Sequence, residues 1–238
     1  MPDTTIRTEA REMPAYVAAP TTAPPWPGVV VIHDVFGMTP LLRRHADWLA
    51  GEGYLAAAPA LYREGRRFAC VRAVFRDLAD GRGKAFDDVE ATRAWLAAQP
   101  GCSGRIGVIG FCMGGGFALA LAARHGFSAS APNYGQLPKN AEAVLEGACP
   151  IVASYGRKDL GLLGAAGKLE KILTAKGVPH DVEEYPEAGH SFLDDFGPAD
   201  APRLLQVVMK LTGQGYHEPS ATHARRRIVA FFDTHLKN

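Results

Sequence analysis

Gly107-Val108-Ile109-Gly110-Phe111-Cys112-Met113-Gly114-Gly115-Gly116 is the most informative segment of this sequence. An apolar run leads into the pattern Gly-x-Cys-x-Gly, and an uncharged helical pattern follows it. Residues 106–123 contain no charged side chain and approach the length of a membrane-spanning helix. Five of these residues are glycines, which favours a buried strand followed by a buried helix over one continuous span.

Apolar runs and helical patterns alternate along the rest of the chain. Runs without polar alternation indicate strands that are buried on both faces of a sheet. The predicted strands are 29–33, 55–59, 105–110, 129–134, 151–155 and 181–185, and the predicted helices are 40–50, 87–98, 113–124, 162–175, 201–211 and 222–236. This alternation predicts an α/β fold, with a mostly parallel central sheet and helices on both faces. The proline-rich residues 20–27 predict a surface connection, and we expect one domain over residues 1–238.

Composition narrows the class of protein. With 47% hydrophobic residues, the 238-residue chain can form one sizeable core. The 26 Lys and Arg side chains balance 25 Asp and Glu, which argues against nucleic acid as the main partner. The N-terminus lacks the apolar segment of a secretory signal, so we expect a cytoplasmic protein with no membrane partner. Its expected state is a monomer or small homo-oligomer.

Cysteine and histidine spacing gives no metal signature. The four cysteines form no CxxC pair, and reduced thiols are the simplest interpretation. His217 and His223 lack zinc-ligand spacing, so we expect no metal and no cofactor. The basic residues 63–84 also include acidic side chains, which favours a solvated helix face over a patch that grips substrate.

The turn around Cys112 has the chemistry of a nucleophile elbow, with cysteine in place of serine. Gly110 and Gly114 lack the Cβ atoms that would collide across such a strained turn. Cys112 would then project from a helix N-terminus, which favours a thiolate, and the Met113 N–H would face a developing oxyanion. Two alternatives compete: glycines that only allow close packing around an inert Cys112, or a nucleotide-binding turn. Neither phosphate-binding fingerprint, GxGxxG nor GK[ST], fits this turn.

An acid and a histidine follow two later predicted strands. Asp159 comes after the strand 151–155, and His190 comes after the strand 181–185. The chain order nucleophile, acid, histidine is typical of this kind of turn, and carboxyl ends of parallel strands gather functional groups. Asp159 as a helix cap and His190 as a surface-loop histidine are the structural alternatives. The occurrence of Cys112, Asp159 and His190 at the ends of three predicted strands predicts a catalytic triad.

Four motifs together resemble the dienelactone hydrolase family, whose members carry a Cys-Asp-His triad on the α/β-hydrolase fold. The motifs are VIHDVFG (31–37), GFCMGGG (110–116), GRKD (156–159) and AGHSF (188–192), and the likeness extends from about Val29 through the final FFDTHL. The resemblance implies hydrolysis of a small ester or lactone through a thioester on Cys112. It also implies that the Val35 N–H is the second oxyanion donor.

The sequence departs from this family at two positions. The family has glutamate where Asp34 stands, and this carboxylate helps control the protonation state of the cysteine, so Asp34 is a candidate for gating the thiol. A turn-capping role is the alternative for Asp34. The family that this sequence resembles also uses an arginine after the histidine to bind a substrate carboxylate, but this chain has Asp194 at that position. A carboxylate would repel an anionic substrate. Asp194 is thus a candidate substrate contact. Tyr134 is another, because it stands close to a position where the family has an aromatic residue that borders the pocket.

Other functional classes remain open from the sequence. A non-catalytic binding protein on this fold would keep the glycines for packing and leave Cys112 unreactive. A thiol-based acyl-transfer or redox protein could use the same Cys112 nucleophile, with Cys149 as a partner if the two lie close in space. Ester or lactone hydrolysis by Cys112, Asp159 and His190 remains the leading hypothesis.

Overall fold

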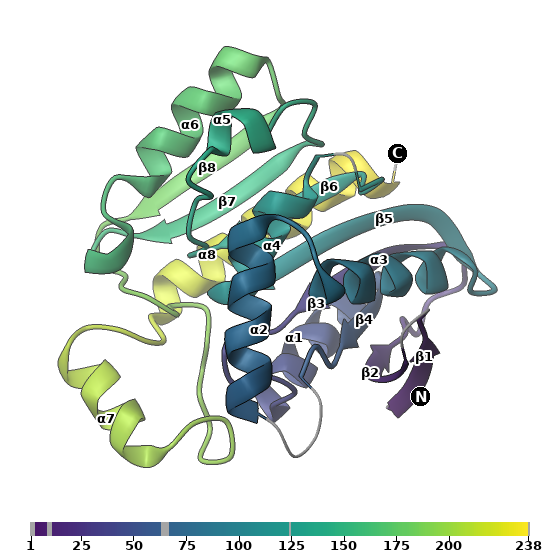
Figure 1. The fold of residues 1–238 in the computed structure, drawn as a ribbon, viewed down its shortest axis with the longest axis horizontal. Helices are drawn as coiled ribbons and strands as arrows, with labels where there is room; N and C mark the ends of the chain where they lie inside the picture. Colours follow the sequence, from purple (N-terminus) through teal and green to yellow (C-terminus); the bar gives the residue numbers. More distant parts are fainter. Residues whose placement is uncertain (1–2, 9–10, 63–66, 124, 238) are drawn as a thin grey trace.

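The computed structural model describes residues 3–8, 11–62, 67–123 and 125–237, which build one eight-stranded sheet (Figure 1). The strands lie in the order β1-β2-β4-β3-β5-β6-β7-β8. Their bounds are β1 Asp3–Arg7, β2 Glu12–Ala18, β3 Trp26–Ile32, β4 Leu55–Pro59, β5 Cys102–Phe111, β6 Ala129–Asn133, β7 Ile151–Gly156 and β8 His180–Tyr185. The strands from β3 to β8 pair in parallel, whereas β1 and β2 are antiparallel additions at one edge. The predicted mostly parallel sheet is therefore confirmed.

Two helical layers cover the sheet (Figure 1). The helices are α1 Pro40–Gly51, α2 Arg67–Asp80, α3 Lys84–Ala97, α4 Met113–Leu121, α5 Ala141–Val144, α6 Ala165–Lys176, α7 Arg203–Leu211 and α8 Glu218–Phe232. Side chains of α1 and α8 share one core cluster, which includes Val29 and Val31 of β3. Side chains of α2, α3 and α4 share another, which includes Val30 and Ile32. Successive residues of β3 thus face opposite layers, which explains why the central strands are apolar throughout.

Several element boundaries differ from those predicted. β1 and β2 were not among the predicted strands, although residues of β2 alternate between exposed and buried. A proline at position 14 interrupts that signal, because proline is expected only in edge strands. The predicted helix 162–175 begins later, at Ala165, after a 3-10 turn η1 at Leu160–Leu162. The predicted helix 113–124 ends at Leu121, and residue 124 lies outside the described residues.

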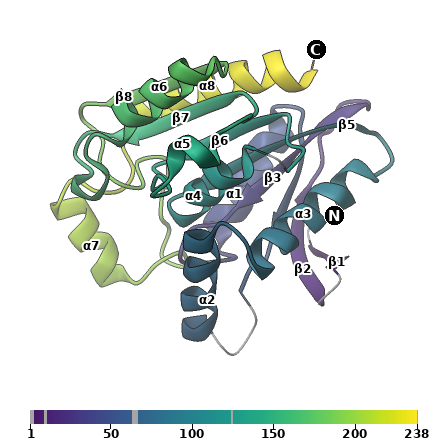
Figure 2. The same cartoon turned by 45° about the horizontal axis from the view of Figure 1, so that its top comes forward.

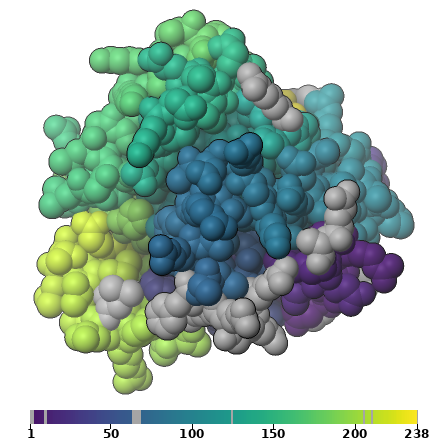
Figure 3. Space-filling model, viewed as in Figure 1, coloured from purple at the N-terminus to yellow at the C-terminus, as the bar shows by residue number. Residues whose placement is uncertain are grey.

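Helix α7 stands apart from the two layers. A long loop (186–202) precedes it and a shorter one (212–217) follows it, and it lies beside α2 at one end of the molecule (Figures 1 and 2). Figure 3 shows α2 on the surface of this face, with the segment around α7 next to it. In the described part of the chain, no helix is long and apolar enough to cross a membrane.

The parallel register brings the segments that follow four strands to one edge of the sheet. Phe111 at the end of β5 pairs with Asn133 at the end of β6. Asn133 pairs with Ser154 of β7, and Gly156 pairs with Tyr185 at the end of β8. The segments that carry Cys112, Tyr134, Asp159 and His190 therefore leave the sheet along the same edge, as expected for a parallel sheet.

Candidate active site

Cys112 occupies a strained turn between β5 and α4. Its backbone has φ 54° and ψ −114°, and it is the N-cap residue of α4. A Cβ on Gly110 would lie 1.9 Å from the Gly114 oxygen, and a Cβ on Gly114 would lie 2.4 Å from the Ile32 oxygen. Glycines are therefore required on both sides of the turn. A positive φ at a non-glycine residue costs about 1–3 kcal/mol and is concentrated at functional sites.

Asp159 and His190 contact each other across two loops. The Nδ1 atom of His190 lies 2.6 Å from Oδ2 of Asp159, whose residue is only 6% exposed. The other carboxylate oxygen, Oδ1, accepts a hydrogen bond from the Gly161 N–H at 3.1 Å and caps η1. Asp159 is thus both a turn cap and the partner of His190, so the two interpretations of its sequence position are compatible.

The electrostatics of His190 depend on both partners. Burial by itself lowers the pKa of His190, but hydrogen bonds to Asp159 and Cys112 and the negative charges of these two groups raise it to about 10. Cys112 is therefore within hydrogen-bonding reach of the imidazole. The structure brings the three predicted residues together, since His190 contacts Asp159 and Cys112 and all three line one cavity.

Two backbone amides near Cys112 have no hydrogen-bond acceptor among the residues that the structure describes. Within the described ranges, neither the Val35 N–H nor the Met113 N–H donates a hydrogen bond. Met113 is the first residue of α4, where amides are left free by the helix geometry. The end of β3 lies against the same turn, as the approach of Ile32 to Gly114 indicates. Both N–H groups that were predicted to bind an oxyanion are thus free to donate a hydrogen bond within the described part of the chain.

A cavity of about 210 Å³ opens onto Cys112 and His190. Four residues that line this cavity were predicted from the sequence, namely Cys112, Met113, Asp159 and His190, and Tyr134 was predicted to border it. Five further lining residues were not predicted: Phe75, Leu78, Gln136, Gly161 and Leu162. Phe75 and Leu78 are three residues apart on α2, and this helical spacing was the available signal.

Tyr134 lies between the cavity and a buried acid. Its ring centroid is 5.2 Å from that of His190, and its hydroxyl donates a hydrogen bond of 2.7 Å to Oδ2 of Asp194. The other oxygen of Asp194 lies 3.0 Å from Nε2 of His45, which stacks on Phe111. Burial raises the pKa of Tyr134, and the negative charges of Asp194 and Cys112 raise it further, so the hydroxyl keeps its proton. Asp194 is 1% exposed and uses both carboxylate oxygens within the protein.

Asp34 is buried at the end of β3. Its Oδ1 accepts a hydrogen bond from the Phe36 N–H at 2.7 Å, and its carbonyl accepts another from the Gly37 N–H at 3.3 Å. This is the turn-capping arrangement that the sequence allowed. The negative charge of Asp34 also contributes to the raised pKa of Tyr134, but Asp34 is not among the described residues that line the Cys112 cavity.

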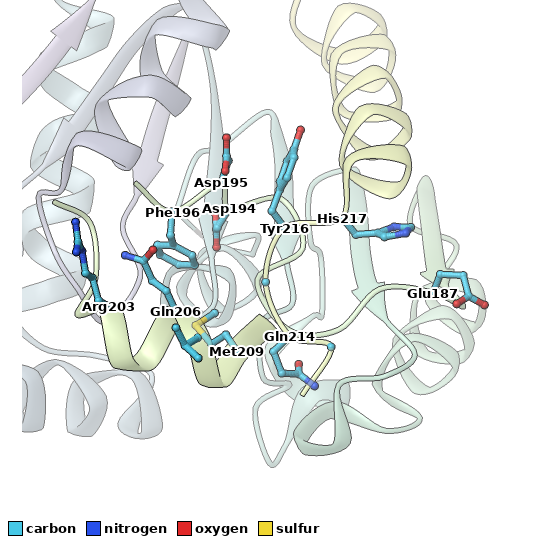
Figure 4. Close-up of a pocket in the computed structure, with 13 residues that line it drawn as sticks. Glu187, Asp194, Asp195, Phe196, Arg203, Gln206, Met209, Gln214, Tyr216 and His217 are labelled. Atoms are coloured by element: carbon cyan, nitrogen blue, oxygen red, sulfur yellow. The ribbon is translucent and has the colours of Figure 1, made fainter. Parts of the chain in front are cut away.

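A second cavity, of about 610 Å³, lies between α7 and the loops that precede and follow it (Figure 4). Its lining includes Phe196, Gln206, Met209, Gln214 and Tyr216, but none of Cys112, Asp159 and His190. In the described ranges, no group of three or more His, Cys, Asp or Glu side chains is arranged to hold a metal ion.

Comparisons with known proteins agree with this geometry. Residues 13–236 match the model of the dienelactone hydrolase family. A carboxymethylenebutenolidase from Rhodococcus opacus is 30% identical over 87% of this chain and 81% of its own. A Yersinia pestis protein, proposed to be such an enzyme, is 28% identical over 98% of this chain and 88% of its own.

The solved structures include a protein from Klebsiella pneumoniae that is itself proposed to be a dienelactone hydrolase. It superimposes with a TM-score of 0.78 and 28% identity, covering 97% of this chain and 96% of that chain. A match of this extent in both sequence and structure establishes the α/β-hydrolase fold and the ester or lactone chemistry. The chain therefore belongs to the dienelactone hydrolase family and is a carboxylic ester or lactone hydrolase.

Proposed function

We propose that this enzyme cleaves uncharged esters or lactones through a thioester on Cys112, with His190 and Asp159 completing a catalytic triad. The observation that carries the proposal is that His190 contacts Asp159 at 2.6 Å and lines the same cavity as Cys112, with both partners raising its pKa. An imidazolium beside a sulfur stabilises the thiolate, which is the nucleophilic form of cysteine.

The proposed reaction has two halves. The Cys112 thiolate attacks the carbonyl carbon, and the amides of Met113 and Val35 bind the oxyanion, each donor lowering the barrier by about 3 kcal/mol. The imidazolium of His190 then gives a proton to the departing alkoxide, which leaves a thioester. In the second half, neutral His190 takes a proton from water, the resulting hydroxide attacks the thioester, and the thiolate departs. Asp159 keeps the imidazole in the required tautomer throughout.

The lining of the Cys112 cavity favours uncharged substrates. None of its described lining residues is Lys or Arg, and the side chains of Phe75, Leu78 and Leu162 are apolar. Asp194 stands where the family has its carboxylate-binding arginine, and it adds negative charge behind Tyr134. An anionic substrate would lack a counter-charge and meet repulsion. We therefore expect p-nitrophenyl acetate to be hydrolysed in preference to mono-p-nitrophenyl succinate.

A redox role is disfavoured by the position of Cys149. The Cys149 N–H donates to the carbonyl of Ala122 at the C-terminal end of α4, whereas Cys112 lies at its N-terminal end. Nine helical residues separate these ends by roughly 14 Å, beyond the Cα separation of about 7 Å that a disulfide tolerates. Burial also raises the pKa of Cys149 to about 12, which keeps its thiol protonated.

The decisive experiment compares the wild type with Cys112→Ala. Loss of p-nitrophenyl acetate hydrolysis by about a thousandfold or more is expected if Cys112 is the nucleophile. Acid quenching during turnover should also trap an acetyl group on Cys112, detectable by mass spectrometry of the peptide. Circular dichroism controls for folding. Equal rates in a folded Cys112→Ala variant would refute the proposal and favour a binding protein on this fold.

A further inference from the structure

The loop after α7 folds back onto the loops that carry Asp159 and His190. Gln214 lies in this loop. Its side-chain amide donates a hydrogen bond of 3.4 Å to the Thr212 carbonyl within the loop and makes two further hydrogen bonds, of opposite sense, to other loops. Its Oε1 accepts from the backbone N–H of His190, and its Nε2 donates to the carbonyl of Lys158 at 3.0 Å. Because Lys158 directly precedes Asp159, one amide group joins the backbones of both members of the Asp159–His190 pair.

Other contacts fix Gln214 in this position. The Gly215 N–H donates to the His190 carbonyl at 2.6 Å, and the Gln214 N–H donates to the Met209 carbonyl of α7 at 2.7 Å. A Cβ on Gly189 would lie 2.3 Å from the Gly213 oxygen and 2.7 Å from Oε1 of Gln214. The glycine before His190 therefore allows the loop to approach this closely.

The Asp159–His190 hydrogen bond needs such support because it spans two loops. The two loops are already joined just before these residues, because the Lys158 N–H donates a hydrogen bond of 2.9 Å to the Ala188 carbonyl. The amide of His190 itself is held by Gln214. A displacement of about 1 Å at a catalytic group is enough to reduce rates strongly.

We propose that Gln214 is a positioning residue that holds Asp159 and His190 in hydrogen-bonding register. This inference rests on the proposed function of the pair. An amide is required because one end accepts and the other donates, whereas an ionised carboxylate only accepts and a hydrocarbon does neither. Gln214 reaches the site from the segment between α7 and α8, far along the chain from Asp159.

The test is the variant Gln214→Leu, with the pKa of His190 measured by NMR titration beside kcat and KM. The groups that face His190 are Asp159, Cys112 and the ring of Tyr134. Loosening the pair removes the hydrogen bond that raises the pKa of His190, so this pKa should fall. We expect kcat for p-nitrophenyl acetate to fall about tenfold or more, with KM changed less than kcat. Gln214→Glu keeps the acceptor and should fall between wild type and Gln214→Leu in both readouts.

Gln206→Leu provides the matched control. Gln206 lies on α7 and lines the same second cavity (Figure 4), but its amide donates to the Gly197 and Ala201 carbonyls at 3.0 and 2.7 Å. This variant should keep the wild-type pKa of His190. The proposal is overturned if Gln214→Leu leaves that pKa and kcat unchanged, or if Gln206→Leu shifts them equally. The NMR readout does not require Cys112 to be the nucleophile, so failure of the proposed reaction would be recognised separately.

Discussion

Removing the hydroxyl of Tyr134 tests the buried contact that joins the cavity to Asp194. In Tyr134→Phe, Oδ2 of Asp194 loses its hydrogen bond of 2.7 Å, while Oδ1 keeps its contact with His45 at 3.0 Å. Both Tyr134 and Asp194 are 1% exposed, so water does not readily replace the lost donor. A hydrogen bond to a charged group contributes about 1.5–3 kcal/mol, so we expect the free energy of unfolding to fall by about 2 kcal/mol.

Urea unfolding of the two proteins measures this change. The midpoint should fall while the slope m stays constant, since the exposed area on unfolding is the same. For a chain of this size, 2 kcal/mol corresponds to a fall in Tm of about 4–8 °C. Tyr155→Phe is the matched control, because the equally buried Tyr155 hydroxyl donates to a neutral acceptor, the Gly135 carbonyl, at 3.1 Å. Its expected cost is about 1 kcal/mol.

A double-mutant cycle assigns the cost to the contact itself. Tyr134→Phe, Asp194→Asn and the double variant should give a coupling of about 1–2 kcal/mol between the two side chains. The reasoning is refuted if Tyr134→Phe costs no more than Tyr155→Phe, or if the coupling is zero within error. Either result would mean that Asp194 is not held as a buried anion by the Tyr134 hydroxyl.

Three further predictions concern the turn, the pH profile and the cavity. Gly110→Ala should destabilise the fold by more than about 3 kcal/mol, because its Cβ would lie 1.9 Å from a backbone oxygen. Gly167→Ala, in open space on α6, should stabilise the fold slightly. Soluble yield and thermal unfolding of both variants test these expectations. In the wild type, kcat/KM should fall as the pH rises through about 10, because His190 loses the proton that it gives to the leaving group. Asp159→Asn should move this fall to lower pH, because a contact that raises the pKa of His190 is weakened; an unmoved alkaline limb would contradict the assignment. Phe75 lines the Cys112 cavity and is 43% exposed, so Phe75→Ser should lower the octanoate-to-acetate ratio of kcat/KM about fivefold for p-nitrophenyl esters, whereas Leu211→Ser, on α7 away from the lining, should not.

Much of the fold follows from local patterns in the sequence. β4 begins and ends at the predicted residues, Leu55 and Pro59, because a short apolar run bounded by turn residues has few other solutions. The predicted turn at Cys112 also follows from its glycines, since they are the residues whose Cβ atoms would meet backbone atoms. β1 and β2 could not be predicted this way, because exposed positions interrupt both strands in place of a continuous apolar run, and β2 contains a proline.

Local sequence patterns were enough to predict the strands from β3 to β8, the turn at Cys112 and the candidate partners Asp159 and His190, because each depends on residues close together in the chain. Only the tertiary structure decided that Asp194 is buried beside His45 and Tyr134, and that Gln214 joins the loops of Asp159 and His190. These contacts span 24 to 149 positions along the chain. No local pattern encodes them, because they form only when the sheet register and the return of the α7 segment bring distant loops to one edge.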